Sequence, residues 1–185
     1  MKGVALGVVV CVVVLLLALP LLVPPAASAE YGKPIYLRGR TVAAPRFLPQ
    51  ALSGHVIIQL AGMPSEEEKL SLALHGIRLL DYIPENAWIA SMDAGAWHPA
   101  IRFAAPLLPS DKTSPGTAGR VVVRMFADVA QEEGAQVLEK FSAKTYSPQT
   151  NAWALWLDQE QVQQLAAEDA VQRIEPIRPL ATELN

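Results

Sequence analysis

The stretch that decides the fold is YIPENAW at residues 82–88, which returns as YSPQTNAW at residues 146–153. The Tyr and Pro of the two copies lie 64 residues apart, whereas the Asn, Ala and Trp lie 65 apart, so the second copy has one extra residue in its turn. The offset of 65 continues outward, where HVIIQL (55–60) aligns with RVVVRM (120–125). Further on, Pro106 and Pro109 align with Pro176 and Pro179 at an offset of 70. The chain therefore contains one unit twice, and the first copy is shorter by five residues near its end.

Two copies are too few for a solenoid, which needs about three stacked units, so each copy is expected to be a small fold of its own. We place the first unit at residues 54–111 and the second, with a C-terminal tail, at 119–185. A linker rich in Thr, Ser, Pro and Gly joins them at residues 112–118. Residues 30–53 contain three prolines without a sustained period and are expected to form an extended lead-in.

Hydrophobic periodicity predicts the elements of the first unit. Alternating apolar residues predict a strand over 55–60, and strands at 78–83 and 87–92 flank the Pro84–Asn86 turn. Ser65 and Glu68 form a capping-box pattern at the start of a helix that Gly76 ends. The apolar stripe that this helix is expected to bury consists of Leu70, Ala73, Leu74 and Ile77.

The second unit shows the same order with a further helix. Strands are expected at 120–126, 144–146, 152–157 and 171–174. Asp128 is expected to cap a helix that buries Ala130, Val137, Leu138 and Phe141, and Asp158 with Gln161 to cap one that buries Val162 and Leu165. The order β-α-β-β-α-β predicts an α+β fold made of two ferredoxin-like units, each with its helices on one face of a four-stranded antiparallel sheet. In the first unit the missing residues and Pro99 predict a shortened second helix.

Residues 1–29 have the three parts of a secretory signal, namely Lys2, an apolar run over 3–19 and the small residues Ala27–Ala29. We expect cleavage after Ala29 and a secreted, periplasmic or cell-surface protein. The alternative is an uncleaved membrane anchor, because the run approaches the roughly 20 residues that span a bilayer. Cys11, the single cysteine, lies in this run. The mature chain would therefore have no disulfide, thiolate metal site or catalytic cysteine.

The charge and histidine patterns argue against several functions. The chain has 15 Lys+Arg against 18 Asp+Glu, and loss of Lys2 with the signal leaves 14 against 18, a formal net charge of −4. Such a chain, without a basic cluster, is not expected to bind nucleic acid. His55, His75 and His98 lack metal-ligand spacing, and no Gly-rich phosphate loop occurs. We therefore expect no metal, no cofactor and no catalytic residues.

The two units resemble the propeptide domains of subtilisin-like serine peptidases, in particular the tandem form that precedes the catalytic domain of larger secreted members. The resemblance rests on LDQEQV (157–162) with Leu165, on DAVQRIEP (169–176), and on Tyr82–Pro84 with Asn86 and Ala87 in the turn. It implies an intramolecular-chaperone or inhibitor-type binder of such a peptidase, in cis or in trans. The Asp, His and Ser motifs of the peptidase itself are absent from this sequence, so the chain is expected not to be an enzyme.

The resemblance also implies a binding surface, in which the open face of the sheet packs on the peptidase and the C-terminal tail enters its cleft. Alternation in the strand 152–157 points Trp156 and Ala154 to that open face, beside Val122. The alternative is that Trp156 packs against the first unit. The tail residues Ile177, Arg178 and Leu180 either extend into a cleft or fray.

Glu85 lies in the turn where members of this family carry an acidic residue that caps helix N-termini of the peptidase. The second unit has Gln149 at that position, and a solvated turn carboxylate is the alternative for Glu85. A different class of function is also open. Two units of about 60 residues are each marginal alone, and they could form a structural or interaction module at the cell surface without a peptidase partner.

Overall fold

The computed structural model describes residues 33–43, 52–141 and 145–177. The chain divides at residue 30, and all described residues belong to the unit Tyr31–Asn185. The expected signal segment at 1–29 and the tail residues Arg178 and Leu180 lie outside the described residues. Within the described ranges no helix combines the length and the apolar character that crossing a bilayer requires.

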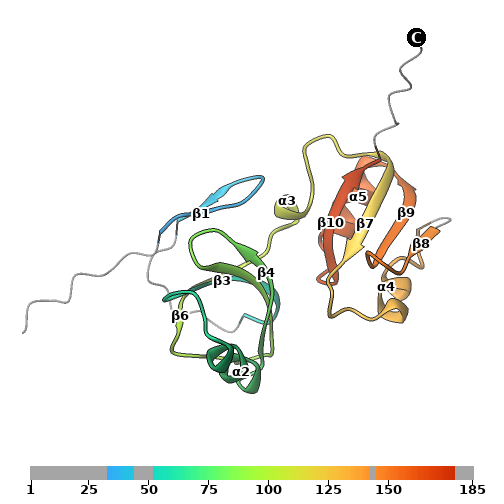
Figure 1. The fold of residues 1–185 in the computed structure, drawn as a ribbon. Helices are drawn as coiled ribbons and strands as arrows, with labels where there is room; N and C mark the ends of the chain where they lie inside the picture. Colours follow the sequence, from blue (N-terminus) through green and yellow to red (C-terminus); the bar gives the residue numbers. More distant parts are fainter. Residues whose placement is uncertain (1–32, 44–51, 142–144, 178–185) are drawn as a thin grey trace, which may run out of the picture. The chain divides into compact units, whose positions relative to one another are not determined.

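The described elements are helices and antiparallel strands, an α+β composition (Figure 1). A short hairpin comes first, β1 (Ile35–Tyr36) and β2 (Thr41–Val42). The first half then contains β3 (Gly54–Leu60), α2 (Glu66–Leu74), β4 (Ile77–Ile83), β5 (Ala87–Met92) and β6 (Ile101–Pro106), followed by the short helix α3 (Pro109–Lys112). The second half contains β7 (Gly119–Met125), α4 (Gln131–Val137), β8 (Thr145–Ser147), β9 (Ala152–Leu157), α5 (Gln159–Ala166) and β10 (Val171–Pro176).

The strand bounds follow the repeat in the sequence. Both ends of β7 lie 65 residues after those of β3, both ends of β9 lie 65 after those of β5, and both ends of β10 lie 70 after those of β6. The two four-stranded sheets have the orders β4-β5-β3-β6 and β10-β7-β9-β8, and every pair in them is antiparallel. In each half, therefore, the first and third strands lie in the centre and the second and fourth form the edges.

The repeated Tyr…Trp motif forms the same hairpin in both halves. Tyr82 lies directly opposite Trp88, and Tyr146 directly opposite Trp153, with ring centroids 5.2 Å and 4.5 Å apart. Asn86 and Asn151, at equivalent positions in the two turns, both have positive φ, of 56° and 44°. Asn tolerates positive φ better than most residues do. This explains why an Asn occurs in both turns, directly before β5 and β9.

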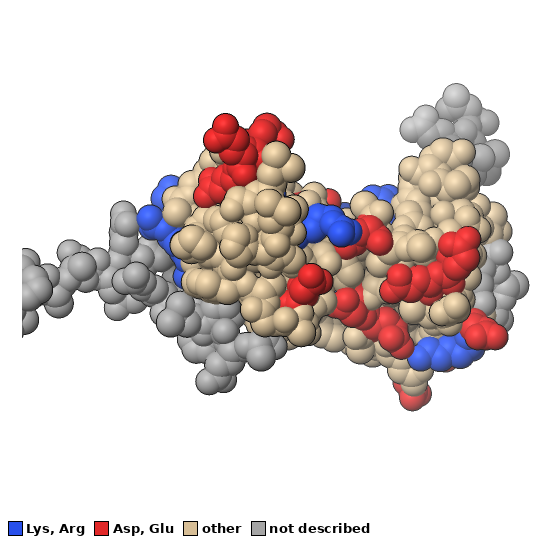
Figure 2. Space-filling view, turned by 90° about the horizontal axis from the view of Figure 1, so that it is seen from below, with Lys and Arg blue, Asp and Glu red and all other residues tan. Residues whose placement is uncertain are grey.

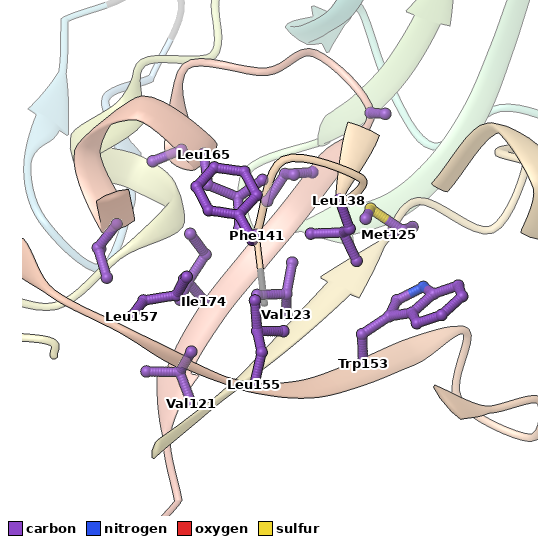
Figure 3. Packing of buried hydrophobic residues seen from close by; sticks show 14 of the residues in the cluster. Val121, Val123, Met125, Leu138, Phe141, Trp153, Leu155, Leu157, Leu165 and Ile174 are labelled. Carbon is purple, nitrogen blue, oxygen red and sulfur yellow. The ribbon is translucent and has the colours of Figure 1, made fainter. Parts of the chain in front are cut away.

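Helices α4 and α5 share a hydrophobic core with one face of the second sheet. Alternate residues of β7 and β9 point into this core, including Val121, Val123, Leu155 and Leu157, and they are buried together with Leu165 of α5 (Figure 3). Asp158 begins α5 with a capping box, in which its side chain accepts a hydrogen bond from Gln161 N–H and its own N–H donates to the Gln161 side chain. This cap was predicted from the sequence.

The sequence prediction for α2 was wrong about which side faces inward. Ser65 caps the helix as expected, but Leu72 is its buried leucine, whereas Leu70 and Leu74 are 67% and 88% exposed. At about 100° per residue, both exposed leucines lie about 160° around the helix from Leu72. Because the sequence LSLALH places leucines at every second position, no single helical face contains all of them, and burial selects Leu72.

The lead-in at 30–53 is not simply extended, because its described part forms the β1–β2 hairpin. Ile35 and Val42 of the hairpin are buried, and they form a separate cluster with Ile57, Ala87, Phe103 and Ala105. These four residues lie on the face of the first sheet that α2 does not cover, since Val56, Ile58 and Leu60 pack with α2 on the other face. The first sheet is therefore covered on both faces.

Three further differences concern the connections. Residues 93–100, all described, contain turns and no helix, so the shortened second helix of the first half is replaced altogether. The expected linker at 112–118 begins inside α3, and its Lys112 is buried, with Nζ donating to the backbone oxygen of Glu168 at 2.7 Å. Asp128 does not cap α4, whose N-cap is Ala130 without a side-chain bond. The Asp128 carboxylate contacts His55 instead.

Candidate protein-binding face

The second sheet has an outer face that α4 and α5 do not cover. Along β9, Trp153, Leu155 and Leu157 are 8%, 5% and 0% exposed and face the helices, whereas Trp156 is 66% exposed. Ala154, on the same side as Trp156, is partly exposed. The alternative in which Trp156 packs against the first half is therefore wrong, because a packed indole would lose most of its accessible surface.

Strand register places the neighbours of Trp156 on this open face. Arg120 lies directly opposite Trp156 on β7, and Val122 lies directly opposite Ala154. Val122 is also partly exposed. Trp156, Ala154 and Val122, which the sequence analysis singled out together, thus form one continuous apolar strip. We call this side of the sheet the open face.

Charged side chains border the apolar strip. Arg120 lies at one end beside Trp156, and at the other end Arg124 lies opposite Ala152 on one side and Arg173 on the other. Glu175, opposite Val122, accepts from Arg38 at 2.9 Å and from Arg173 at 3.4 Å. Neither Arg120 nor Arg124 forms an ion pair with another described residue. Sequence reasoning missed these arginines because their clustering depends on the pairing of β7 with β10.

The last described residue, Ile177, lies at the same end of the sheet as Trp156, with β7 between them. The N–H of Ile177 donates to the backbone oxygen of Arg120 at 2.8 Å, which extends the β10–β7 ladder by one bond past Pro176. Since Arg120 lies opposite Trp156, the C-terminal segment starts one strand away from the exposed indole. Arg178 and Leu180, which follow, are outside the described part of the chain.

Glu85 does not belong to the open face, because its turn joins β4 and β5 of the first sheet. Its carboxylate forms an ion pair with Lys33 at 2.9 Å, and its side chain is 33% exposed. The Glu85 backbone oxygen also accepts from the side chain of buried Gln59 at 3.0 Å. The turn carboxylate is therefore neither free in solvent nor placed beside Trp156, but ties the start of the described chain to the first sheet.

His55 is a second feature that sequence reasoning missed. Its Nδ1 lies 2.7 Å from Oδ2 of Asp169 and its Nε2 3.1 Å from Oδ1 of Asp128, and its ring stacks on Phe126 with centroids 3.8 Å apart. The side chains of His55 and Asp128 are 7% and 11% exposed. Because a carboxylate only accepts hydrogen bonds, both ring nitrogens must donate, which requires the protonated imidazolium.

The charges around this cluster act on both His55 and Asp169. Burial of the His55 ring lowers its pKa, but the hydrogen bonds and charges of Asp169 and Asp128 outweigh burial and raise the pKa above its ordinary value. The hydrogen bond from the His55 side chain holds the pKa of Asp169 below its usual value, against the opposing effect of burial. The cluster therefore joins strand β3 to the turns that follow β7 and α5.

A serine and a histidine also meet in the first half. Ser71 Oγ lies 3.0 Å from Nε2 of His98, while Nδ1 of His98 accepts from Ala100 N–H at 3.2 Å. That second bond assigns the proton of a neutral ring to Nε2, which then donates to Ser71 instead of accepting its proton. In a catalytic pair the histidine accepts the hydrogen bond from the hydroxyl of the nucleophile, so the hydrogen bond between Ser71 and His98 runs in the opposite direction.

Comparison with known proteins gives a match to a family model. The model of a family described as a domain of unknown function (DUF8729) matches residues 27–107. The matched span takes in the β1–β2 hairpin and all four strands of the first sheet, and it ends one residue after β6. No curated protein matches the chain, and no solved structure does.

Proposed function

We propose that this chain is a secreted, non-catalytic binding module of the propeptide type, which binds a subtilisin-like serine peptidase as an intramolecular chaperone or inhibitor. The proposal includes the cleaved signal at 1–29, two ferredoxin-like units, and a partner that acts in cis or in trans. The observation that carries it is the open face with Trp156 at 66% exposure.

The topology supports the ferredoxin-like part of the proposal. The order fourth-first-third-second strand occurs in both sheets, with a helix between the first and second strands of each half. A helix between the third and fourth strands occurs in the second half as α5. That arrangement leaves one sheet face free of helices, and such a face can pack on a partner.

The position of the C-terminal segment supports the mode of binding. Trp156 provides a large apolar anchor, and an exposed Trp beside small residues is typical of an interface centre. The chain departs at Ile177 from the same end of the sheet. A partner held on the open face would therefore lie next to the first residues of the tail, as binding of an extended strand in a cleft requires.

The binding function can be tested with the purified chain and a panel of subtilisin-like peptidases. We expect it to slow peptide hydrolysis by at least one of them, and Trp156→Ala to weaken inhibition at least tenfold. Leu74→Ala is the matched control, because Leu74 is 88% exposed but lies on α2. Full inhibition by the Trp156 variant, or no binding to any peptidase in the panel, would contradict the proposal.

A structural module without a peptidase partner is the second candidate, and the His55 cluster favours it. The two halves are joined through His55 with Asp128 and Asp169, and through Gln172, which donates to Asp81 at 2.6 Å. Expressing the halves separately distinguishes the candidates. Two halves that are unfolded apart, combined with no peptidase binding by the whole chain, would support the structural module.

A further inference from the structure

We propose that the open face binds an acidic protein surface, with Arg120, Arg124 and Arg173 pairing with partner carboxylates around an apolar contact made by Trp156, Val122 and Ala154. This inference rests on the proposed function and specifies the chemistry of the partner. It places two kinds of contact side by side, an apolar strip in the middle and positive charge at both ends.

The spacing of the arginines follows from the strands. Arg120 and Arg124 are four residues apart on β7, which corresponds to about 13 Å at roughly 3.3 Å per residue. Val122 lies between them on the same face. Arg173 is opposite Arg124 on the neighbouring strand, so two guanidinium groups lie at one end of the strip and one beside Trp156 at the other. A partner that fits must carry carboxylates on both sides of an apolar patch.

The first half shows that the repeat does not itself require arginines at these positions. By the offsets of 65 and 70, Arg120, Arg124 and Arg173 correspond to His55, Gln59 and Phe103, and Trp156 corresponds to Ser91. Phe103 is buried under the β1–β2 hairpin, and Gln59 is 3% exposed and bonded to the backbone oxygens of Lys33 and Glu85. The arginines therefore occur in the copy whose face stays open.

The rest of the second half has charge of the opposite sign. Glu132 and Glu133 lie in the first turn of α4 and Glu160 in that of α5, on the side of the sheet that the helices cover. Figure 2 shows a view of the molecule in which acidic side chains predominate over basic ones. The net charge of the whole chain is −3. In the second half, the open face carries three arginines and one glutamate, whereas the side that the helices cover carries mainly acidic residues.

An acidic protein surface fits these observations better than a nucleic acid. Glu175, which pairs with Arg38 and Arg173, places a carboxylate within the arginine group, where it would repel a continuous phosphate backbone. The apolar strip between the arginines matches a protein surface with an apolar centre and a charged rim. Arg forms forked bonds with carboxylates and stays charged when desolvated, which suits the border of such an interface.

The test uses two designed antiparallel two-helix coiled coils as probes, each with an apolar patch at the centre of one exposed face, and identical except that the exposed positions around the patch carry Glu in one and Lys in the other. We expect the full chain to bind the Glu probe and not the Lys probe, with affinity falling as salt rises from 50 to 500 mM. Replacing Arg120, Arg124 and Arg173 by Gln should weaken binding at least tenfold, and replacing them by Lys should restore part of it.

The control replaces three basic residues elsewhere by Gln, namely Arg102 and Lys140, which are exposed, and Lys69, which is partly exposed, and this changes the net charge equally. Circular dichroism and thermal unfolding check that each variant folds. Equal affinity for both probes, no binding of the Glu probe, an unchanged affinity of the arginine variant, or tighter binding of a 20-base-pair DNA duplex would overturn the inference. The peptidase panel is a separate readout. If the chain binds the Glu probe but no peptidase, the proposed function is wrong and the inference about an acidic partner stands.

Discussion

His55 and Asp169 are joined twice, although they are 114 residues apart in the chain. The Asp169 carboxylate accepts from the His55 backbone N–H at 2.8 Å and from its ring Nδ1 at 2.7 Å, while Asp128 contacts the other ring nitrogen. One side chain of β3 thereby fixes two turns of the other half, and it does so only in its protonated form.

This protonation gives stability a defined pH dependence. The folded-state pKa of His55 is raised above its ordinary value of 6.5, so the contribution is complete below that value and is lost as pH rises through the folded pKa. The pKa of Asp169 is lowered from 3.8, so its contribution is complete above that value and is lost as pH falls through the lowered pKa. Thermal unfolding from about pH 5 to pH 9 should show the midpoint of the wild type falling toward that of His55→Gln.

The substitution His55→Gln should also destabilise the chain by about 1–3 kcal/mol near pH 6, because it removes the charged partner that contacts the largely buried carboxylate of Asp128 at 3.1 Å and leaves only Arg78, at 3.7 Å. The matched control is His75→Gln, an exposed histidine whose Nδ1 bonds the Ser71 backbone oxygen within its own helix. A wild-type advantage that stays constant across the pH range would contradict the imidazolium assignment.

Trp153 and Trp156 lie three residues apart on β9 and should respond in opposite ways to substitution. Trp153→Ala removes an indole that is 8% exposed and belongs to the hydrophobic core of the second half, so it should lower the free energy of unfolding by about 3–5 kcal/mol. Trp156→Ala removes a 66% exposed one and should change stability by about 0.5 kcal/mol or less. Urea unfolding measures both. A large loss at Trp156 would mean that the open face is covered.

The orientation of α2 can be checked in the same way. Leu72→Ala should cost about 2–5 kcal/mol, because Leu72 is fully buried against the first sheet. The double substitution of Leu70 and Leu74 by Ser should cost less than about 1 kcal/mol, since both side chains are exposed. A larger loss of stability in the Leu70 and Leu74 double variant than in Leu72→Ala would mean that α2 buries the face predicted from the sequence.

The sequence predicts strands better than helix orientation here, and the reason is physical. Alternation along β7 and β9 has a period of two, so it separates buried Leu155 from exposed Trp156 without knowledge of the rest of the fold. In α2, leucines at every second position match no helical face, and only packing against the sheet selects Leu72. Periodicity therefore placed the apolar strip of the open face correctly.

The features that the sequence did not predict depend on long-range pairing. Asp128 precedes a helix, and its position suggested a cap, but the hydrogen bond with His55, 73 residues earlier, determines its role. The arginines of the open face come from strands whose order and register no local pattern reveals. The hairpin over the first sheet likewise depends on Ile35 and Val42, which lie in a stretch with several prolines and no sustained apolar period.

Two glycines at equivalent positions should separate backbone strain from steric clash. Gly54 and Gly119 begin β3 and β7 with φ of +78° and +86°. Gly119→Ala meets nothing within 4 Å and should cost only the left-handed conformation, about 1–2 kcal/mol. At Gly54 a Cβ would lie 2.7 Å from Asp169 Oδ1, so Gly54→Ala should cost more and should reduce the pH dependence that His55 gives. Equal costs at the two sites would mean that Asp169 is displaced easily.

The β1–β2 hairpin has a consequence for stoichiometry. A chain with two similar sheets would be expected to be bivalent, but the hairpin occupies in the first sheet the surface that stays accessible in the second. If the open face binds a partner as proposed, the duplicated chain should be monovalent, with the second copy facing the partner and the first serving as a scaffold. Binding titrations should reach saturation at one partner per chain, and removal of the hairpin would raise valency only if the uncovered first sheet stayed folded.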